Sequence, residues 1–410
     1  MNSKRCRFCG SQSLQTFVDL GMSPLANSYI KLEKLQNMER FYPLHCFVCN
    51  YCFLVQLEEF EGPKVIYNDY AYFSSYSDTW LKHAQAYVEL MLKNETLSSQ
   101  SQVVEIGSND GYLLQYFMAN NIPVLGIEPA ANVARAAQNK GIPTLDKFFN
   151  SELAGKLVSD GLMADLIVGN NVLAHVPDLI DFVNGLKMLL KPHGLITLEF
   201  PHLMRLIAGN QFDTIYHEHF SYFSFTTVEK VFAAHKLKLV EVEELPTHGG
   251  SLRIYASHAG NTARFTAERV VELKRREEAY GLTRRETYQA FDERVKKTKR
   301  QILRFLIQAK EEGKSLVGYG AAAKGNTLLN YCGIRKDFLD YVVDRSPYKQ
   351  GLFLPGTHLL INPPEMVRQT KPDYLFILPW NIKAEIMEQM AYIREWGGKF
   401  VVPIPEVEVS

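Results

Sequence analysis

The sequence has no excess of charge of either sign. Its 410 residues include 45 Lys plus Arg and 45 Asp plus Glu, so the formal net charge at pH 7 is zero. Proteins that grip a nucleic-acid backbone usually carry a basic excess, because the neutralised phosphates supply much of the affinity. We therefore expect no nucleic-acid partner.

Long apolar runs are also missing. No stretch reaches the roughly 20 apolar residues that a membrane-spanning helix needs. The first ten residues, MNSKRCRFCG, are charged and lack the apolar core of a signal peptide. These absences predict a cytoplasmic protein without membrane contact. A chain of 410 residues is long for a single core, which predicts two or three domains.

Cysteine is scarce and unevenly placed. Five of the six cysteines fall within the first 52 residues. Cys6 with Cys9, and Cys49 with Cys52, are CxxC pairs, but Cys46 also forms a CxxC with Cys49, so the spacing leaves the ligand set open. Such pairs without a secretion signal favour a metal site over disulfides. A closed four-thiolate Zn²⁺ site is structural, because no position is left for water or substrate.

Strands and helices alternate from about residue 102. Apolar runs such as VVEIG, PVLGIEP, DLIVGNN and GLITLEFP are separated by stretches with helical apolar spacing, and SDTWLKHAQAYVELMLKNE before them predicts a capped amphipathic helix. This alternation is typical of a doubly wound parallel sheet.

A second region of strands and helices is expected to follow. To it we assign a helix and two strands in VEKVFAAHKLKLVEVEEL and GGSLRIYASH, and one or two long helices in residues 262–309. SLVGYGAAAKGNTLLNYCGI predicts a strand, a glycine-containing turn and a helix, and DYVVDRSP, DYLFILPW and KFVVPIP predict further strands. These segments indicate a smaller Rossmann-like half.

The segment VVEIGSNDGYLL indicates a nucleotide-type cofactor site. Glu105 ends a buried strand and is followed by Gly107 and Gly111, which let the backbone approach a ligand. The spacing differs from the G-x-G-x-x-G of NAD sites. Glu128 ends the next strand, where a carboxylate can hold both ribose hydroxyls. An α/β domain that binds another nucleotide is the alternative.

This pattern is similar to class I S-adenosylmethionine methyltransferases, which implies S-adenosylmethionine as cofactor. The cofactor-binding residues implied are Glu105, Gly107, Asn109, Asp110, Gly111, Glu128, Pro129, Asn170 and Asn171.

The segment IYHEHFSYFS follows the fifth strand of this domain and is dense in titratable groups. Tyr216, His217, Glu218, His219 and Tyr222 fall within seven residues. Such density at the mouth of a sheet indicates an active site. An HxH metal site is the alternative, although no third ligand with suitable spacing is evident nearby.

The whole chain resembles the sugar C-methyltransferase family that makes branched deoxysugars such as tetronitrose and kijanose. The segments that carry the resemblance are the cysteine module ending in CxxC-x-LVQL, EIGSNDG, IYHEHFSYFS, THGGSLR, GYGAAAKGNTLLN, DxxPxKxGxxxPG and LPWN. Phe53 departs from it, because we expect a small residue after the last cysteine. The resemblance leaves Cys46 spare and implies the zinc ligands Cys6, Cys9, Cys49 and Cys52.

The resemblance also implies the fold and the domains. We expect an α/β fold in which a zinc-binding module (1–68) and a C-terminal Rossmann-like α/β domain (246–410) flank a class I methyltransferase Rossmann-like domain (69–245). The C-terminal domain is expected to bind the nucleotide-linked sugar, and the protein is expected to be a monomer.

Methylating a carbon beside a ketone needs a base, donors for an enolate oxygen and a methyl group held close by. A 4-keto-6-deoxysugar offers such a carbon at C3, which we expect to be methylated, and at C5, which is the alternative. We expect His219 to be the base, because imidazole titrates in the useful range, although His217 and His219 could exchange roles. The other expected catalytic residues are Tyr216, Glu218, His175 and Tyr70, with Tyr72 beside it.

The substrate is expected to be a dTDP- or GDP-linked keto-deoxysugar. GAAAKGN opens a helix whose amides and lysine suit a diphosphate, and Trp380 offers a flat face to a base. The expected substrate-binding residues are His217, Tyr222, Ser251, Arg253, Lys324, Lys349 and Trp380. The competing functions are a small-molecule O- or N-methyltransferase, an RNA methyltransferase and a non-catalytic nucleotide-binding protein.

Overall fold

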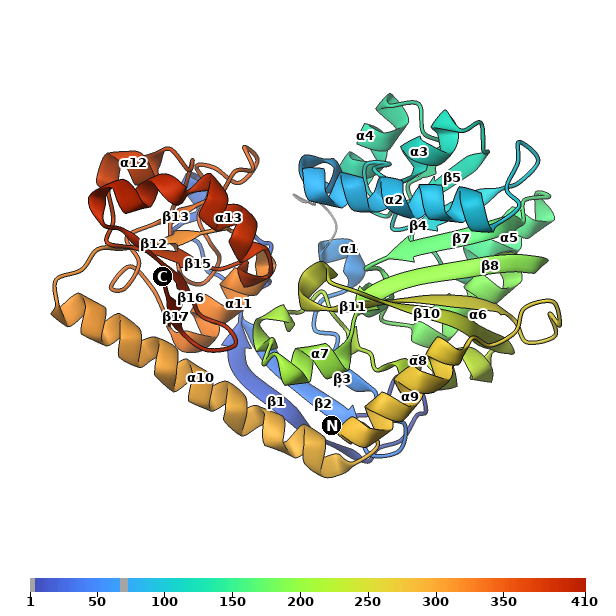
Figure 1. The fold of residues 1–410 in the computed structure, drawn as a ribbon, viewed down its shortest axis with the longest axis horizontal. Helices are drawn as coiled ribbons and strands as arrows, with labels where there is room; N and C mark the ends of the chain where they lie inside the picture. The colour runs from blue at the N-terminus through green and yellow to red at the C-terminus, as the bar shows by residue number, and fades with distance from the viewer. Residues whose placement is uncertain (1–3, 67–72) are drawn as a thin grey trace.

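The computed structural model describes residues 4–66 and 73–410, and within them the strands form three sheets (Figure 1). The seven-stranded and six-stranded sheets lie on opposite sides of the view in Figure 1, and the long helix α10 (Arg285–Glu311) runs along the base between them. Among these described residues, no helix is long and apolar enough to cross a membrane.

The N-terminal sheet is antiparallel and holds strands in the order β1-β2-β3-β9. Its last strand comes from the segment IYHEHFSYFS, since Tyr222 pairs with Val55. This pairing attaches the residues expected in the active site to the cysteine module. The strands are β1 (Leu14–Ser23), β2 (Tyr42–Cys49), β3 (Val55–Leu57) and β9 (Ser221–Tyr222), and the short helices near them are η1 (Leu32–Lys34), α1 (Pro63–Ile66) and η2 (Ser74–Tyr76).

The middle sheet has the strand order β10-β11-β8-β7-β4-β5-β6. Its central strands are parallel, as the alternation of strands and helices predicts, and β11 runs antiparallel to both of its neighbours. The strands are β4 (Val103–Ile106), β5 (Val124–Ile127), β6 (Thr144–Leu145), β7 (Ala164–Asn170), β8 (Leu190–Pro201), β10 (Leu237–Leu245) and β11 (Ser251–His258).

Helices cover both faces of the middle sheet. One apolar core includes side chains of α2 (Asp78–Asn94), α3 (Leu114–Ala119) and α4 (Ala131–Asn139). The other includes side chains of α5 (Ser151–Ser159), α6 (Leu179–Leu189), α8 (Phe225–Ala234) and α9 (Glu268–Tyr280). The amphipathic helix expected after residue 77 is α2, and the Ser77 side chain caps it by accepting from the amide of Trp80.

The middle sheet extends past the boundary expected at residue 245. We assigned VEKVFAAHKLKLVEVEEL, which forms most of α8 and β10, and GGSLRIYASH, which forms β11, to the second α/β region, but β10 and β11 pair within the middle sheet. Seven of the eight residues of β11 are buried, so the strand lies inside the methyltransferase sheet and not at its edge. The strand itself is predicted correctly, whereas the domain to which it belongs is not.

The C-terminal sheet has the strand order β14-β13-β12-β15-β16-β17, and all of its pairs are parallel except β16 with β17. Its strands are β12 (Leu316–Tyr319), β13 (Val342–Val343), β14 (Ile361–Asn362), β15 (Tyr374–Ile377), β16 (Lys399–Val402) and β17 (Glu408–Val409). Its helices are α11 (Ala323–Cys332), α12 (Met366–Thr370), α13 (Lys383–Gln389), η6 (Trp380–Ile382) and η7 (Ala391–Trp396).

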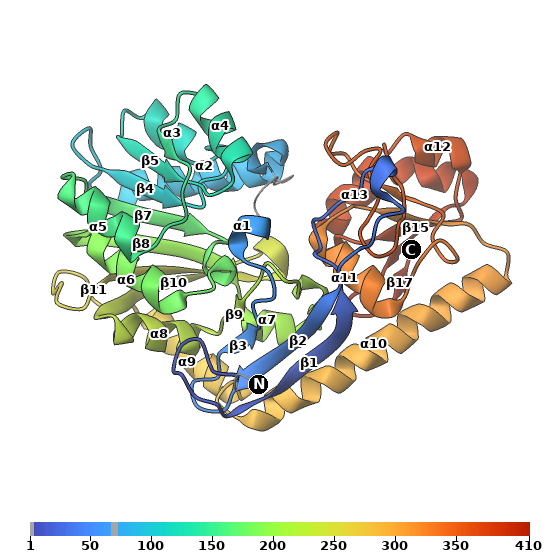
Figure 2. The same ribbon diagram turned by 180° about the vertical axis from the view of Figure 1, so that it is seen from behind.

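The N-terminal module also packs against α10, which lies beside β1 when the molecule is seen from behind (Figure 2). The ring of Phe17 stacks on that of Phe291, with centroids 4.5 Å apart and planes 5° apart. Residue Ile30 pairs with Phe353 of the C-terminal domain through reciprocal backbone hydrogen bonds of 2.9 and 2.8 Å. These contacts join the module to the C-terminal part of the chain, and the pairing of β3 with β9 joins it to the middle domain.

Candidate active site

A cavity of about 610 Å³ lies where the three parts of the chain meet. Asn27 and Tyr29 line it from the N-terminal module, and Lys324 and Lys349 line it from the C-terminal domain. The middle domain supplies the largest share of the wall, including the turn η3 (Leu173–His175). A substrate bound here would contact all three parts.

Six of the nine expected cofactor-binding residues line this cavity. They come from the carboxyl ends of parallel strands, where ligands of open α/β sheets bind. Gly107 has a φ of +67°, and a Cβ there would lie 3.3 Å from Val172, so the turn favours glycine. The six residues are Gly107, Asn109, Glu128, Pro129, Asn170 and Asn171.

Glu128 has the environment expected of a ribose-binding carboxylate. Its Oε1 accepts from the amide of Ala130 and its Oε2 from the amide of Asn109, each at 2.9 Å. These bonds fix the carboxylate and leave lone pairs that hydroxyl groups can reach. Burial raises the pKa of Glu128 to about 7, although the two amides lower it.

The remaining three expected cofactor residues do not line the cavity. Glu105 is fully buried in β4, and burial raises the pKa of its carboxyl well above the ordinary value. Asp110 forms an ion pair with Lys140 at 3.0 Å. Gly111 has a φ of +78°, and a Cβ there would lie 2.1 Å from the side chain of Ile142. Asp110 and Gly111 thus hold the shape of the loop.

His219 lies at the centre of a cluster of rings that lines the cavity. Its ring centroid is 4.0 Å from that of Tyr216 and 4.6 Å from that of His175. Burial lowers the pKa of His219 well below its ordinary value, and the neighbouring His175 lowers it further. Burial also lowers the pKa of His175 to about 4. Both imidazoles are therefore neutral near pH 7.

The tautomer of His219 follows from its hydrogen bond. Its Nδ1 lies 3.0 Å from the carbonyl oxygen of Thr214. A carbonyl oxygen can only accept, so Nδ1 carries the hydrogen and Nε2 keeps its lone pair. This arrangement leaves Nε2 able to take a proton.

His217 is placed differently from His219, although they are two residues apart. His217 does not line the cavity. Its Nε2 lies 3.3 Å from the carbonyl oxygen of Pro43, and its ring meets those of Tyr42 and Phe60 edge-on. Tyr222 also lies away from the main cavity, buried in β9. Neither residue is positioned to touch a ligand in the main cavity.

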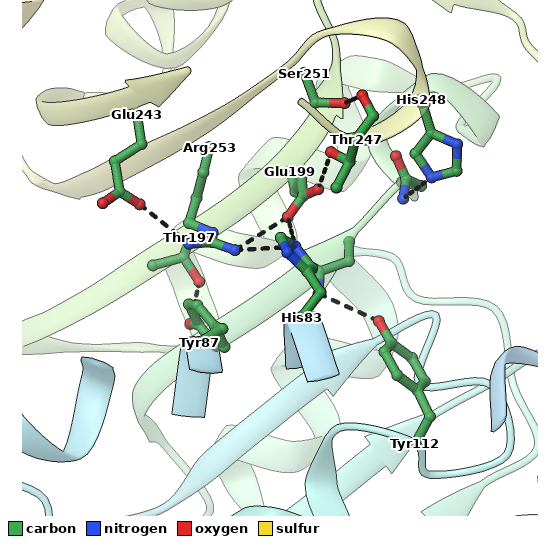
Figure 3. A network of polar contacts seen from close by, with 12 residues as sticks. His83, Tyr87, Tyr112, Thr197, Glu199, Glu243, Thr247, His248, Ser251 and Arg253 are labelled. Atoms are coloured by element: carbon green, nitrogen blue, oxygen red, sulfur yellow. Dashed lines mark hydrogen bonds and ion pairs between the residues drawn. The ribbon is translucent and has the colours of Figure 1, made fainter. Parts of the chain in front are cut away.

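Ser251 and Arg253 belong to a buried polar network beside the cavity (Figure 3). Arg253 donates to Glu199 at 3.2 Å and to Glu243 at 3.1 Å, and the Ser251 hydroxyl donates to the carbonyl of Thr247 at 3.0 Å. The Arg253 guanidinium therefore already pairs with two carboxylates. Neither side chain lines the cavity as expected of a phosphate contact.

The same network supports the wall of the cavity. The carboxylate of Glu199 accepts from Thr247 at 2.7 Å and contacts His83 at 2.8 Å (Figure 3). Burial alone would raise the pKa of Glu199, but His83 and Arg253 outweigh it and the pKa is lowered. Thr247 is followed by His248, which lines the cavity and lies 3.2 Å from the side-chain nitrogen of Asn171.

The two expected lysines line the cavity, and Trp380 does not. Lys324 donates to the side chain of Asn381 at 2.6 Å, and Lys349 donates to the carbonyl of Ala321 at 2.9 Å. Trp380 donates from its indole to Asp213 at 2.7 Å, and its ring is packed beneath the Lys324 ammonium, 5.0 Å from the ring centroid. Tyr70 and Tyr72 lie outside the described residues.

Several residues that line the cavity were not predicted from the sequence. Trp80 and Tyr112 stack with ring centroids 5.9 Å apart, and Trp80 also meets His248 edge-on. His248 has a φ of +54° and precedes two glycines with positive φ. The THGG motif was a usable signal, because a strained turn often marks a functional site. Asn27 and Tyr29 carry no such signal.

The four cysteines implied by the resemblance come together. The sulfur atoms of Cys6, Cys9, Cys49 and Cys52 all lie within 4.8 Å of one another, and Cys46 is not in this group. Thiolates around a tetrahedral Zn²⁺ sit about 2.3 Å from the metal, which such a cluster can satisfy. The four residues therefore fit a closed, structural zinc site.

Three family models match successive parts of the chain. Residues 6–67 match a family described as "Putative zinc binding domain", residues 80–242 match "Methyltransferase domain", and residues 246–405 match "C-methyltransferase C-terminal domain". The last match begins at the expected boundary, although β11 completes the middle sheet.

A curated relative covers nearly the entire chain, whereas similarity to solved structures is weak. C-methyltransferase NovU of Streptomyces niveus is 35% identical over 404 residues, which are 98% of this chain and 96% of the relative. Magnesium protoporphyrin IX methyltransferase of Synechocystis PCC 6803 is 14% identical, with a TM-score of 0.35, over 48% of this chain and 88% of that one. The chain belongs to the S-adenosylmethionine-dependent C-methyltransferase family that its motifs resemble.

Proposed function

We propose that the protein methylates C3 of a nucleotide-linked 4-keto-6-deoxysugar through an enolate, with C5 of the same sugars as the alternative position. The observation that carries the proposal is the shared lining of one cavity. The cofactor loop, the His219 cluster and two lysines of the C-terminal domain all line it. The two lysines, the proposed base and the bound cofactor would thus all lie beside the same substrate molecule.

His219 would generate the carbon nucleophile. Its Nε2 takes the proton from the carbon beside the ketone, and the electrons of the broken C–H bond move to the ketone oxygen as an enolate. Because the pKa of His219 is lowered, the imidazole is free to accept that proton at neutral pH. Bound S-adenosylmethionine supplies the methyl group, carried on a positively charged sulfur.

Tyr216 and His175 would stabilise the enolate oxygen. The Tyr216 hydroxyl is a hydrogen-bond donor, and a neutral imidazole such as that of His175 retains one N–H to donate. Glu218 lines the same cavity and offers a carboxylate to the sugar hydroxyls or to a neighbouring ring. Each of these groups contacts the reacting part of the substrate in this proposal.

Lys324 and Lys349 would hold the diphosphate of a dTDP or GDP carrier. Two ammonium groups in one cavity complement the two negative charges of a diphosphate. The proposal includes a cytoplasmic monomer. A four-thiol zinc site needs the reduced cysteines of a reducing compartment, which supports the cytoplasmic location.

The test is methyl transfer in deuterated buffer. The zinc-loaded protein is incubated with S-adenosylmethionine and a panel of dTDP- and GDP-linked 4-keto-6-deoxysugars, and products are followed by mass and NMR. We expect one added methyl group and a new carbon–carbon bond at C3. A methyl group at C5 would select the alternative position. No methyl gain and no deuterium uptake with any sugar, in protein that binds S-adenosylmethionine, would overturn the proposal.

A further inference from the structure

The N-terminal module supplies a side chain, that of Asn27, which forms a hydrogen bond with Glu218 of the proposed reaction centre. Asn27 lines the cavity, and its Nδ2 donates to Oε1 of Glu218 at 2.6 Å. The two residues are 191 positions apart in the chain. The contact therefore depends on the folded arrangement of the module against the methyltransferase domain.

The orientation of the Asn27 amide follows from its hydrogen-bond acceptor. A carboxylate only accepts, so the NH₂ group must face Glu218. The other end of the amide, Oδ1, lies 3.3 Å from the Tyr29 hydroxyl oxygen, whose single hydrogen is directed to the carbonyl of Ala321. A hydrogen bond to an ionised carboxylate is shorter and roughly twice as strong as one between neutral groups.

The backbone that carries Asn27 is held by the C-terminal domain. Asn326 donates from its side chain to the carbonyl of Ala26 at 3.2 Å, and the Tyr29 hydroxyl donates to the carbonyl of Ala321 at 2.5 Å. With the pairing of Ile30 and Phe353, these contacts anchor the segment on both sides of Asn27. The amide is thus presented to Glu218 from a rigid support.

We propose that Asn27 is a positioning residue, which holds the Glu218 carboxylate in its productive orientation. This inference rests on the proposed function, in which Glu218 lines the reaction cavity. A half-rotation of a carboxylate costs little when nothing holds it, whereas catalysis requires atoms to be placed within a fraction of an ångström. The cysteine module then has a part in catalysis as well as in folding.

Two substitutions separate positioning from general folding. Asn27→Ala removes the donor, and we expect kcat to fall about ten- to a hundredfold while S-adenosylmethionine affinity is unchanged. Asn27→Asp keeps the shape but places a second carboxyl 2.6 Å from Glu218. Two carboxyls so close share one proton, because the negative charge of the first raises the pKa of the second. Near pH 6 the shared proton restores a donor, so this variant should be most active there and lose activity toward pH 8.

The pH comparison is made against the wild-type profile, because other groups around Glu218 are common to both proteins. Each variant is assayed from pH 5.5 to 8.5 with dTDP-4-keto-6-deoxyglucose and saturating S-adenosylmethionine. Asn37→Ala, at an exposed asparagine of the same module, is the matched control and should keep the wild-type profile. The titratable groups that line the cavity with Glu218 in both proteins are Tyr29, His175, Tyr216, His219 and Lys349.

A second measurement needs no turnover. In protein labelled with ¹³C at glutamate carboxyls, the Glu218 resonance is assigned through Glu218→Gln and titrated. We expect the Glu218 pKa to rise by about one unit in Asn27→Ala, since a hydrogen bond to its charged form is lost. An unchanged pKa together with wild-type kcat would overturn the inference. A wild-type protein that transfers no methyl to the panel overturns the proposed function instead, and the titration still decides the Asn27–Glu218 interaction.

Discussion

At the scale of single residues, two histidines with the same chemistry have different surroundings. The sequence could place both His217 and His219 at the mouth of the sheet, but it could not distinguish them, because the contact that holds His217 comes from a segment 174 residues away. The carbonyl of Pro43, which accepts from His217, belongs to the N-terminal module. His219 instead contacts Thr214 and lines the cavity.

The two histidines should therefore respond differently to one substitution. We expect His219→Gln to lower kcat by about 10²–10⁴-fold and to abolish deuterium uptake at the sugar carbon, because the proposed base is lost. His217→Gln is the matched control and should keep both activities within about tenfold. Deuterium exchange measured by NMR distinguishes them, and the reverse ranking would make His217 the base.

Glu128 predicts a pH-dependent affinity for the cofactor. Its pKa of about 7 means that the carboxylate is present above pH 7 and is lost as the pH falls through that value. If the charged form holds the ribose hydroxyls, the dissociation constant of S-adenosylmethionine should rise about tenfold from pH 8 to pH 6. Calorimetry tests this expectation. Glu128→Gln should remove the dependence, whereas Glu152→Gln, at an exposed site on α5, should retain it.

At the scale of elements, the local sequence pattern predicts that a strand forms more reliably than it predicts which strands pair with it. α2, the two long helices α9 and α10, and the strand–turn–helix around α11 all form where periodicity and caps indicate. β11 is also a strand as expected, but it inserts between β8 and β10 and so belongs to the methyltransferase sheet. Which strands pair depends on packing across the whole domain, which apolar spacing does not encode.

The network around β11 predicts a structural role for Arg253. Arg253 is 4% exposed and pairs with the fully buried Glu199. Removing one partner of a buried ion pair costs about 3–5 kcal/mol, so Arg253→Ala should lower the free energy of unfolding by that amount. Arg269→Ala, which breaks an exposed pair with Glu241, should cost about 1 kcal/mol or less. Urea denaturation compares the two variants. An Arg253→Ala variant of unchanged stability with a raised KM for the sugar would instead support a contact between Arg253 and the substrate phosphates.

The cysteine cluster joins the chain before β1 to the turn after β2. Cys9→Ser should reduce the zinc content below one per chain and lower the melting temperature, because a four-ligand structural site loses a thiolate. Cys46→Ala is the matched control, since Cys46 is buried outside the cluster and should retain one zinc. Metal analysis after gel filtration measures both, and zinc loss from Cys46→Ala alone would revise the ligand set.

At the scale of the whole molecule, the site is assembled from three parts that the sequence could treat only separately. Strand ends predict the cofactor residues, and the dense segment at residues 216–222 predicts the base. The cavity also requires Asn27 and Tyr29, which lie in the module expected only to hold zinc. Their role comes from the docking of that module on the C-terminal domain, and no local feature of their sequence indicates it.

In the proposed function, the middle domain binds the cofactor and the C-terminal domain binds the diphosphate of the substrate. This predicts that substrate and cofactor affinities can be changed independently. Lys324 belongs to the C-terminal domain, while Gly107 and Glu128 belong to the middle sheet. Lys324→Met removes the charge but keeps an apolar stem, so the KM for the nucleotide-linked sugar should rise at least tenfold while S-adenosylmethionine affinity stays constant. Lys336→Met, at an exposed lysine of the same domain, is the control. Weaker S-adenosylmethionine binding with an unchanged sugar KM would place Lys324 with the cofactor, and the diphosphate would then need another cation in the cavity.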